Sequence, residues 1–414
     1  MYSYKNCILV LFLVVVMSGF AQDTLNSEIV EQRSYQFYIN KNWKELINFG
    51  NKAINNGIDY YYLRIRIGIA YFEKKNFSSA ENHFKKTLNF NSDDELAKEY
   101  LYYCYLYNGK NEEARLLSKS FSTVLSEKIK TNKQSSIEFI MFEGGTKLSD
   151  SSKYYNKNLI TRPYYFDAPV YLQLGLKHYI KNKFSVFHAL TYYYQRATYD
   201  TVSQIQYYLK ATIPIKQNIL ISPSIHYLMT AVTKEIVVNQ TELANKHNTT
   251  HNLVGSLTIQ KTIQKTVIGL GTTVSNINKI TQYIHSGLLS YSIFGNSKLV
   301  LGCTGYVHTI DNYKTSYVAL APFVYIQPIK RLSLKLSLFT NPNVNIIEDN
   351  GYFVNNSPNI TQSRYSTLLN FSLNKYVDVY GVYQLEFKHY PAFEKNPAFD
   401  YRYNVFVLGI KIKP

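Results

Sequence analysis

The sequence predicts an α + transmembrane β protein, in which a helical repeat array precedes an antiparallel β-barrel of about 14 strands. Three observations predict this fold class. The first 21 residues have the pattern of a secretory signal, and up to residue 134 apolar residues recur at helical spacing within a 34-residue repeat. From residue 135, apolar and polar residues alternate with period two. The predicted units are therefore 1–21, 22–134 and 135–414.

The N-terminal segment has the three parts of a cleavable signal peptide. Lys5 supplies the positive charge, residues 8–17 form the apolar run, and Gly19-Phe20-Ala21 is a small-residue cleavage site. The apolar run is too short to span a bilayer as a helix, and no later stretch reaches the roughly 20 apolar residues that a spanning helix needs. If the chain spans a membrane, it must do so as a closed barrel, because only helices and closed barrels satisfy every backbone polar group in lipid.

The repeat region contains three copies, at about 27–60, 61–94 and 95–128. The middle copy has the small and aromatic residues that let two helices approach closely, namely Ile67, Gly68, Tyr71, Ala80 and Phe84. The third copy keeps Leu101, Tyr105 and Ala114. The first copy is weaker, because it has Leu46 at the position of Ala80 and Gly50 at the position of Phe84. This 34-residue period resembles the tetratricopeptide repeat, although no copy has the closing proline of that family.

The resemblance implies that the first helix of each repeat lines a concave face. The residues at those positions are Tyr35, Tyr38, Tyr62, Ile65, Ile69, Phe72, Glu99, Tyr103 and Leu106. They either form a groove for an extended peptide or a partner's tail, or they provide ordinary packing between the repeats. The last helix, at about 112–130, runs almost directly into the first strand. The barrel rim or a partner is therefore expected to cover the exposed end of the array.

The strand region divides into 14 segments that alternate in the apolar and polar character of their residues. The segments are 136–146, 167–180, 183–197, 202–214, 218–232, 250–262, 265–275, 280–294, 297–309, 315–328, 331–341, 363–374, 376–390 and 400–413. Short connections alternate with longer ones, as in bacterial barrels with short periplasmic turns and longer external loops. Counts of 12 or 16 strands remain possible alternatives. A soluble β-sandwich is disfavoured, because many segments exceed the usual strand length.

A barrel of this size encloses more room than side chains fill. The connections at 233–249 and 342–362 are rich in Asn and Thr, and they fold either inward as a plug or outward as a binding surface. The net charge of +17 comes mostly from the strand region, where many lysines stand at the short turns. We interpret them as a basic rim on one side of the barrel rather than as a selectivity device. No recognition motif for nucleic acid accompanies the charge.

The sequence contains no motif for catalysis, metal binding or cofactor binding. His251 lies near Ser256, and His285 precedes Ser286, but residues placed in this way along a strand are expected by chance. Cleavage leaves Cys104 and Cys303, which form neither a disulfide framework nor a zinc motif. We therefore predict a protein that is not an enzyme, with no cofactor and no metal.

The mature chain as a whole resembles bacterial outer-membrane proteins that join periplasmic repeats to a barrel, in particular the small YaiO-like barrels and repeat–barrel proteins of the Bacteroidota. The Tyr-, Asn- and Lys-rich composition suits that source. Exopolysaccharide export porins and surface-lipoprotein assembly modifiers share the architecture, but three repeats are fewer than the long array of the export porins.

The resemblance implies a non-enzymatic outer-membrane barrel of a Gram-negative bacterium, which contacts outer-membrane lipid. Its repeats would lie in the periplasm and recruit a protein or peptide partner for export, assembly or envelope organisation. The alternative is a passive diffusion porin, and a more remote alternative is a lipid hydrolase that uses His251. A nucleic-acid partner is not expected.

Overall fold

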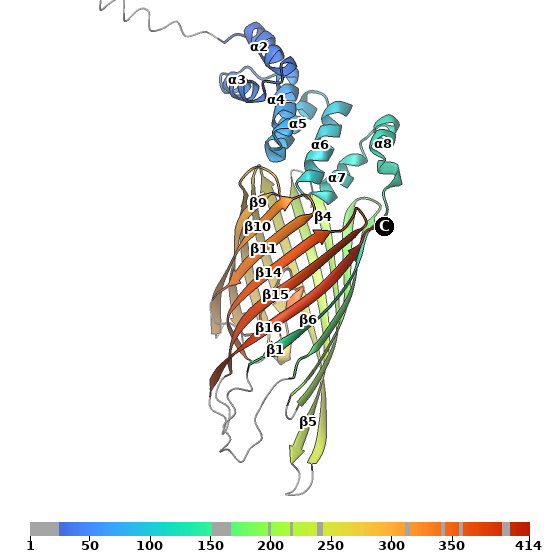
Figure 1. The fold of residues 1–414 in the computed structure, drawn as a ribbon, viewed down its shortest axis with the longest axis vertical. Helices are drawn as coiled ribbons and strands as arrows, with labels where there is room; N and C mark the ends of the chain where they lie inside the picture. The colour runs from blue at the N-terminus through green and yellow to red at the C-terminus, as the bar shows by residue number, and fades with distance from the viewer. Residues whose placement is uncertain are drawn as a thin grey trace, which may run out of the picture.

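A helical array sits on one mouth of a closed β-barrel in the computed structural model of the protein (Figure 1). The structure describes residues 25–150, 167–197, 200–215, 218–237, 243–310, 315–340, 344–355, 359–390 and 398–414. The predicted signal peptide at 1–21 lies outside the described residues.

Within the described residues, the α-helices form three antiparallel pairs and one further short helix. Their bounds are α2 Ser27–Ile39, α3 Trp43–Asn55, α4 Tyr61–Glu73, α5 Phe77–Phe90, α6 Glu95–Tyr107, α7 Asn111–Ser118 and α8 Thr123–Ile129. The first helices of the pairs start at residues 27, 61 and 95, and the second helices start at residues 43, 77 and 111. Both series therefore repeat every 34 residues. Among the described residues, no helix is long and apolar enough to cross a membrane.

The repeat residues build the core between the helices. Ala80 and Phe84 of α5 are fully buried, and a side chain at Gly68 of α4 would meet the Phe84 ring at 2.8 Å. This glycine therefore sets the close approach of α4 and α5. A single helix over about 112–130 was predicted, but the structure ends α7 at Ser118 and starts α8 at Thr123. The break arises because the Ser122 side chain accepts a hydrogen bond from the Leu125 amide and caps a new helix.

Fourteen strands close into one antiparallel barrel, which confirms the predicted fold class and strand number. Their bounds are β1 Ile137–Ser149, β2 Val170–Ile180, β3 Phe184–Arg196, β4 Asp200–Ile215, β5 Ile219–Val237, β6 Leu243–Ile263, β7 Thr266–Ser275, β8 Gln282–Ser292, β9 Leu299–Ile310, β10 Thr315–Ile329, β11 Leu332–Phe339, β14 Ile360–Ser372, β15 Val377–Tyr390 and β16 Phe399–Ile412. Each strand pairs with its neighbour in sequence, and β16 pairs with β1 to close the barrel. A two-residue pair, β12 Ile347–Glu348 and β13 Phe353–Val354, stands apart from the wall.

The two long connections behave differently. The connection predicted at 233–249 is mostly strand, because β5 and β6 stay paired from Thr233 opposite His247 to Val237 opposite Leu243. Its polar residues resemble those of a loop, but backbone pairing holds them in an extended ribbon, visible in Figure 1 as the longest strands of the barrel. The other connection folds into the barrel.

The barrel exterior is apolar and its interior is polar. On β2 and β3, Leu172 and Leu190 are 54% and 51% exposed, whereas the adjacent Gln173 and Thr191 are buried toward the lumen. The same alternation runs around the wall, where Leu270 and Leu408 are the most exposed apolar side chains. Exposed apolar residues over a whole wall are far more extensive than a soluble protein tolerates. The chain is therefore a transmembrane barrel of the outer-membrane type.

Candidate functional site

An inward hairpin made of residues 344–355, here called the lumen hairpin, forms the first candidate site. Its tip is Asp349-Asn350-Gly351, and all three residues have positive φ, the conformation that Asn, Asp and Gly adopt most readily. On either side of the tip, Glu348 pairs with Phe353 and Ile347 pairs with Val354. The apolar residues beside the tip explain why the hairpin turns away from water and toward the barrel interior.

The tip of the lumen hairpin reaches the far wall. Asn350 accepts hydrogen bonds through its carbonyl oxygen from the hydroxyls of Ser224 on β5 and Tyr208 on β4. The carbonyl oxygen of Gly351 lies 2.7 Å from Nδ1 of His226. Beyond the tip, the Tyr352 hydroxyl is hydrogen-bonded to the Gln173 side chain of β2. The hairpin is thus fixed to three strands that lie opposite its origin.

Aromatic and aliphatic contacts fill the space around the hairpin. The Tyr352 ring lies 5.0 Å from the Tyr208 ring and 5.8 Å from the Phe187 ring, centroid to centroid. Ile347 packs in a buried cluster with Leu228, Val254, Ile277 and Ile284 from the wall and from the short η3 turn, Ile277–Lys279. These contacts span β3 to β8, so the lumen hairpin crosses the lumen from its own wall to the facing strands.

An ion pair holds the base of the hairpin. The guanidinium of Arg364, on β14, is paired with the Glu348 carboxylate, and both side chains are about nine-tenths buried. The same guanidinium lies 4.7 Å from the Phe353 ring centroid and 5.4 Å from that of Phe339. Arg364 is therefore the charged contact that links the hairpin to the strand wall from which it departs.

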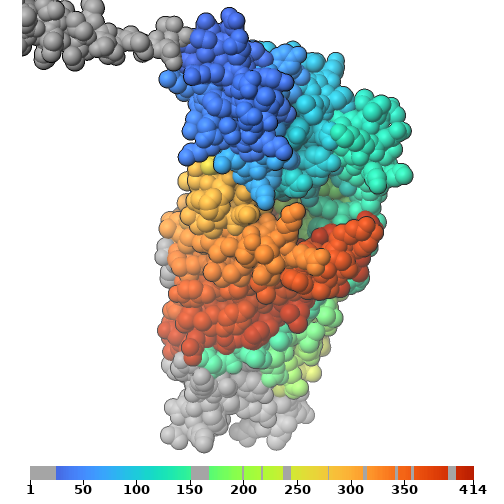
Figure 2. Space-filling view, turned by 45° about the horizontal axis from the view of Figure 1, so that its top comes forward, coloured from blue at the N-terminus to red at the C-terminus, as the bar shows by residue number. Residues whose placement is uncertain are grey.

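The second candidate site is the interface between the helices and the turn-side mouth, meaning the barrel end with the turns at 181–183, 264–265, 330–331 and 373–376. The helices rest directly on this end, as Figure 2 shows. Glu112 of α7 accepts from Lys177 of β2 at 2.8 Å and from the Ser185 hydroxyl of β3 at 2.8 Å. Lys177 also pairs with Glu138 of β1 at 2.9 Å. Burial alone would raise the pKa of Glu112, but the Lys177 ammonium, together with hydrogen bonds from Lys177, Ser185 and the backbone, holds this pKa below its usual range.

A second contact joins α5 to the turn between β4 and β5. Glu81 accepts from Lys85 and Lys110 at 2.7 Å each and from the Asn218 amide at 2.8 Å. Burial opposes ionisation, yet the two ammonium groups keep the pKa of Glu81 below its usual range. One helical turn earlier, the Ser78 amide donates to the carbonyl of Gly295, in the turn between β8 and β9, at 2.9 Å. The array is therefore attached to turns on widely separated strands.

The structure divides the predicted partner groove into three groups. Ile65 and Ile69 are 8% and 6% exposed and lie in the helical core, because α4 is covered by the helices on both sides. Four residues are half-buried and packed against neighbours: Tyr38, Phe72, Glu99 and Tyr103. Three residues remain accessible: Tyr35, Tyr62 and Leu106. The first two flank Arg66, whose guanidinium lies 5.2 and 5.8 Å from their ring centroids.

The basic residues occupy two places. Lys181, Lys265 and Lys330 lie in turns of the turn-side mouth, while Lys216 lies outside the described residues. A further set of basic side chains, which sequence analysis did not single out, faces the lumen: Lys147, Lys177, Lys210, Lys335, Arg364, Lys388 and Lys411. The basic charge of the strand region is therefore not confined to the rim of the barrel, because part of it lies inside the lumen.

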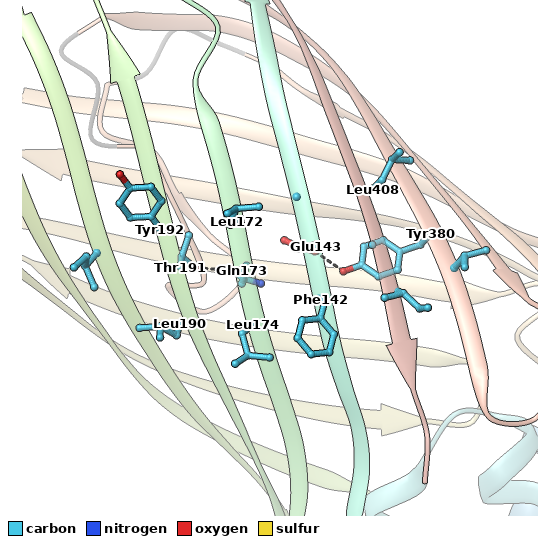
Figure 3. Close-up of a pocket in the computed structure, with 15 residues that line it drawn as sticks. Phe142, Glu143, Leu172, Gln173, Leu174, Leu190, Thr191, Tyr192, Tyr380 and Leu408 are labelled. Atoms are coloured by element: carbon cyan, nitrogen blue, oxygen red, sulfur yellow. Dashed lines mark hydrogen bonds between the residues drawn. The ribbon is translucent and has the colours of Figure 1, made fainter.

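The outer wall carries a third feature, an apolar groove of about 860 Å³ across β16, β1, β2 and β3 (Figure 3). Its sides are the exposed side chains Phe142, Leu172, Leu174, Leu190 and Leu408. Behind the groove, the lumen-facing Glu143 accepts hydrogen bonds from the hydroxyls of Tyr171 and Tyr380.

The serine–histidine pairs considered for catalysis do not form. His251 faces outward on β6, where it is hydrogen-bonded to the Tyr227 hydroxyl, whereas Ser256 is buried on the lumen face and bonded to Thr273. His285 and Ser286 are adjacent and therefore point to opposite faces of β8. Within the described ranges, no group of three potential metal ligands occurs.

Sequence analysis left the connection at 342–362 as either an inward plug or an outward surface, and the described residues 344–355 take the inward alternative. The tight turn itself had a signal, because Asp349-Asn350-Gly351 between apolar residues is typical of a hairpin. The local sequence did not determine whether this hairpin points into or away from the barrel, and Arg364 was not identified. Arg364 carried no signal beyond a charged residue within an alternating strand.

No protein-family model matches the sequence, and no curated protein matches it. Solved structures with a similar barrel include the CymD monoaromatic hydrocarbon channel, at 8% identity and a TM-score of 0.45, covering 69% of this chain and 90% of that one. The Ralstonia pickettii toluene transporter TbuX matches at 6% identity with a TM-score of 0.42, covering 67% and 90%. Acinetobacter baumannii Omp33 matches at 10% with a TM-score of 0.36, covering 68% and 100%. At these values the likeness concerns the barrel and carries no inference about function.

Proposed function

We propose that the protein is a non-enzymatic outer-membrane barrel that is closed at rest by the lumen hairpin and recruits a periplasmic protein partner through its helices. It would act in export, assembly or envelope organisation. The observation that carries this proposal is the combination of a hairpin that crosses the lumen to the facing wall and a helical array fixed to one mouth. A barrel closed in this way needs a second event to open it, and the array stands where such an event would begin.

The orientation follows from the connections. Short turns face the periplasm in bacterial barrels, and the helices contact the turn-side mouth through Glu112, Glu81 and Ser78. The array therefore belongs in the periplasm. We retain the assignment of its 34-residue pairs to the tetratricopeptide class as part of the proposal, together with the division of the mature chain at residue 134.

The partner surface is proposed at the accessible part of the predicted groove. Tyr35 and Tyr62 are 48% and 59% exposed and flank Arg66, whose guanidinium is buried and paired with the Glu31 carboxylate, so the surface offers two aromatic faces held in place by this ion pair. Aromatic side chains are among those that most often dominate protein interfaces. An extended peptide segment with apolar or aromatic side chains fits this chemistry.

Partner recruitment is tested by affinity purification from membranes with crosslinking. We expect the Tyr35→Ala/Tyr62→Ala protein to lose a partner that the native protein retains. Val124→Ala is the matched control, because Val124 is exposed on α8 outside the groove. Equal recovery of bound proteins by all three proteins would refute the proposed surface.

The closed lumen is tested separately in planar bilayers. Replacement of residues 345–354 by a short Gly-Ser linker should convert a protein with little steady conductance into an open pore. Steady conductance by the native protein would instead support the diffusion porin, for which the polar lumen wall is the favourable observation.

A further inference from the structure

The outer-wall groove lies within the apolar exterior and is continuous with it. Its exposed apolar side chains point outward, and its floor is backbone, because Gly144 faces outward on β1 and has no side chain. Bulky neighbours on both sides, such as Leu172 and Leu408, stand above this floor. In a bilayer, hydrocarbon is the solvent at this surface, so the occupant of the groove must be hydrocarbon.

A polar cluster adjoins the groove on the same outward face. His188 lies two residues from the groove residue Leu190 on β3, toward the turn-side mouth. Its Nε2 is 3.2 Å from Nε2 of His178, and the two rings are stacked with 5.3 Å between centroids. Its Nδ1 is 2.7 Å from the Tyr207 hydroxyl, two residues along β4 from the groove residue Ile205.

The three side chains form a hydrogen-bonded chain that has one donor to spare. If His178 donates to His188, then His188 donates to Tyr207, and the Tyr207 O–H remains available. If the chain runs the other way, Tyr207 donates to His188, His188 donates to His178, and Nδ1–H of His178 remains available. Either direction presents a donor to the bilayer beside the groove. Donors exposed to lipid are costly unless they find an acceptor.

We propose that this face binds one phospholipid, with an acyl chain in the outer-wall groove and a phosphate oxygen on the His178–His188–Tyr207 cluster. The apolar groove favours a hydrocarbon chain. The available hydrogen-bond donor of the cluster favours a lipid whose headgroup carries a hydrogen-bond acceptor. The proposal concerns the lipid-facing wall and does not depend on the partner or on the lumen hairpin.

The experiment uses the full chain, purified in mild detergent, and native mass spectrometry with added palmitoyl-oleoyl phosphatidylethanolamine. The diacylglycerol with the same chains is the probe that lacks the phosphate. We expect the native protein to retain one phospholipid and to prefer it over diacylglycerol by about tenfold, the effect of one hydrogen bond to a charged group.

Two matched pairs of variants separate the parts of the site. Gly144→Leu fills the groove and should abolish retention of both lipids, whereas Gly287→Leu adds the same bulk to an outward position with open space around it and should not. His188→Leu should remove the preference for phospholipid, whereas His251→Leu, which removes another outward histidine bonded to a tyrosine, should keep it.

Equal lipid retention by Gly144→Leu and Gly287→Leu would overturn the groove, and an unchanged preference in His188→Leu would overturn the cluster. A side chain at Gly144 would lie 3.2 Å from a Leu172 methyl group, so Leu190→Trp provides a second way to fill the groove. Heat-modifiable migration on gels confirms that each variant is folded before lipid is added.

Discussion

Removing the Arg364 guanidinium should open the lumen. In Arg364→Ala, the Glu348 carboxylate would remain about nine-tenths buried without its cation. An uncompensated buried charge costs about 3–5 kcal/mol. Since about 1.4 kcal/mol corresponds to a factor of ten, the ratio of closed to open hairpin should fall by a factor of about one hundred to a few thousand. The lumen hairpin can avoid this cost by detaching from the wall, because detachment returns the Glu348 carboxylate to water.

Planar-bilayer recording measures this effect as the fraction of time in a conducting state. Lys335→Met is the control for lumen charge, because Lys335 faces the lumen over Phe323. The double variant Arg364→Met/Glu348→Gln removes both charges and should restore much of the closure. If Arg364→Ala conducts no more than Lys335→Met, the ion pair does not hold the hairpin and the reasoning fails.

Three further predictions concern the helices. Burial, with the neighbouring Arg64 charge, lowers the pKa of His83 from 6.5 to about 3. The unfolded chain then binds a proton that the folded array does not, so stability is complete above about pH 6.5 and should fall by about 2 kcal/mol at pH 5. Glu112→Gln should weaken docking by about 2 kcal/mol, the value of a charged hydrogen bond, since Lys177 keeps its second carboxylate. Gly68→Ala should cost about 1–3 kcal/mol by overpacking.

Each of these predictions has its own measurement. Thermal unfolding of the helices, followed by far-ultraviolet circular dichroism across pH, tests His83, and an equally steep acid loss in His83→Gln would exclude this residue as the cause. Hydrogen exchange of the α7 amides tests Glu112, with the exposed Glu45→Gln as control. Unchanged exchange would show that the pair does not contribute to docking. For Gly68→Ala, an unfolding midpoint equal to the native one would mean that Phe84 moves aside at no cost.

The strand region was predictable because its signal is local and repeated. Val170-Tyr171-Leu172-Gln173-Leu174 alternates its faces residue by residue, and the short turns divide the segments, so all 14 segments correspond to barrel strands. The ribbon formed by β5 and β6 extends beyond its prediction, because residues 243–249 are held in strand by backbone pairing with residues 231–237 rather than by their own alternation.

The candidate sites were harder to predict, since each depends on residues far apart in sequence. Arg364 meets Glu348 inside the lumen, and Glu112 of a helix meets Lys177 of a strand 65 residues away. For the predicted groove residues, the helical period identifies the helix face that carries them. It does not identify which of these residues a neighbouring helix buries. Ile65 and Tyr62 illustrate the difference, because Ile65 is buried and Tyr62 is exposed.

Local sequence is enough to establish the period of each region, the 34-residue spacing of the helices and the alternation that places polar residues inside the barrel and apolar residues outside it. These properties follow from backbone geometry, which repeats every 3.6 residues in a helix and every two in a strand. Local sequence does not establish that residues 344–355 turn inward, that the helices dock on the turn-side mouth, or that His178, His188 and Tyr207 meet beside a groove. Those outcomes depend on closure of the barrel, because closure brings distant strands together and creates the interior and exterior surfaces that the side chains then occupy.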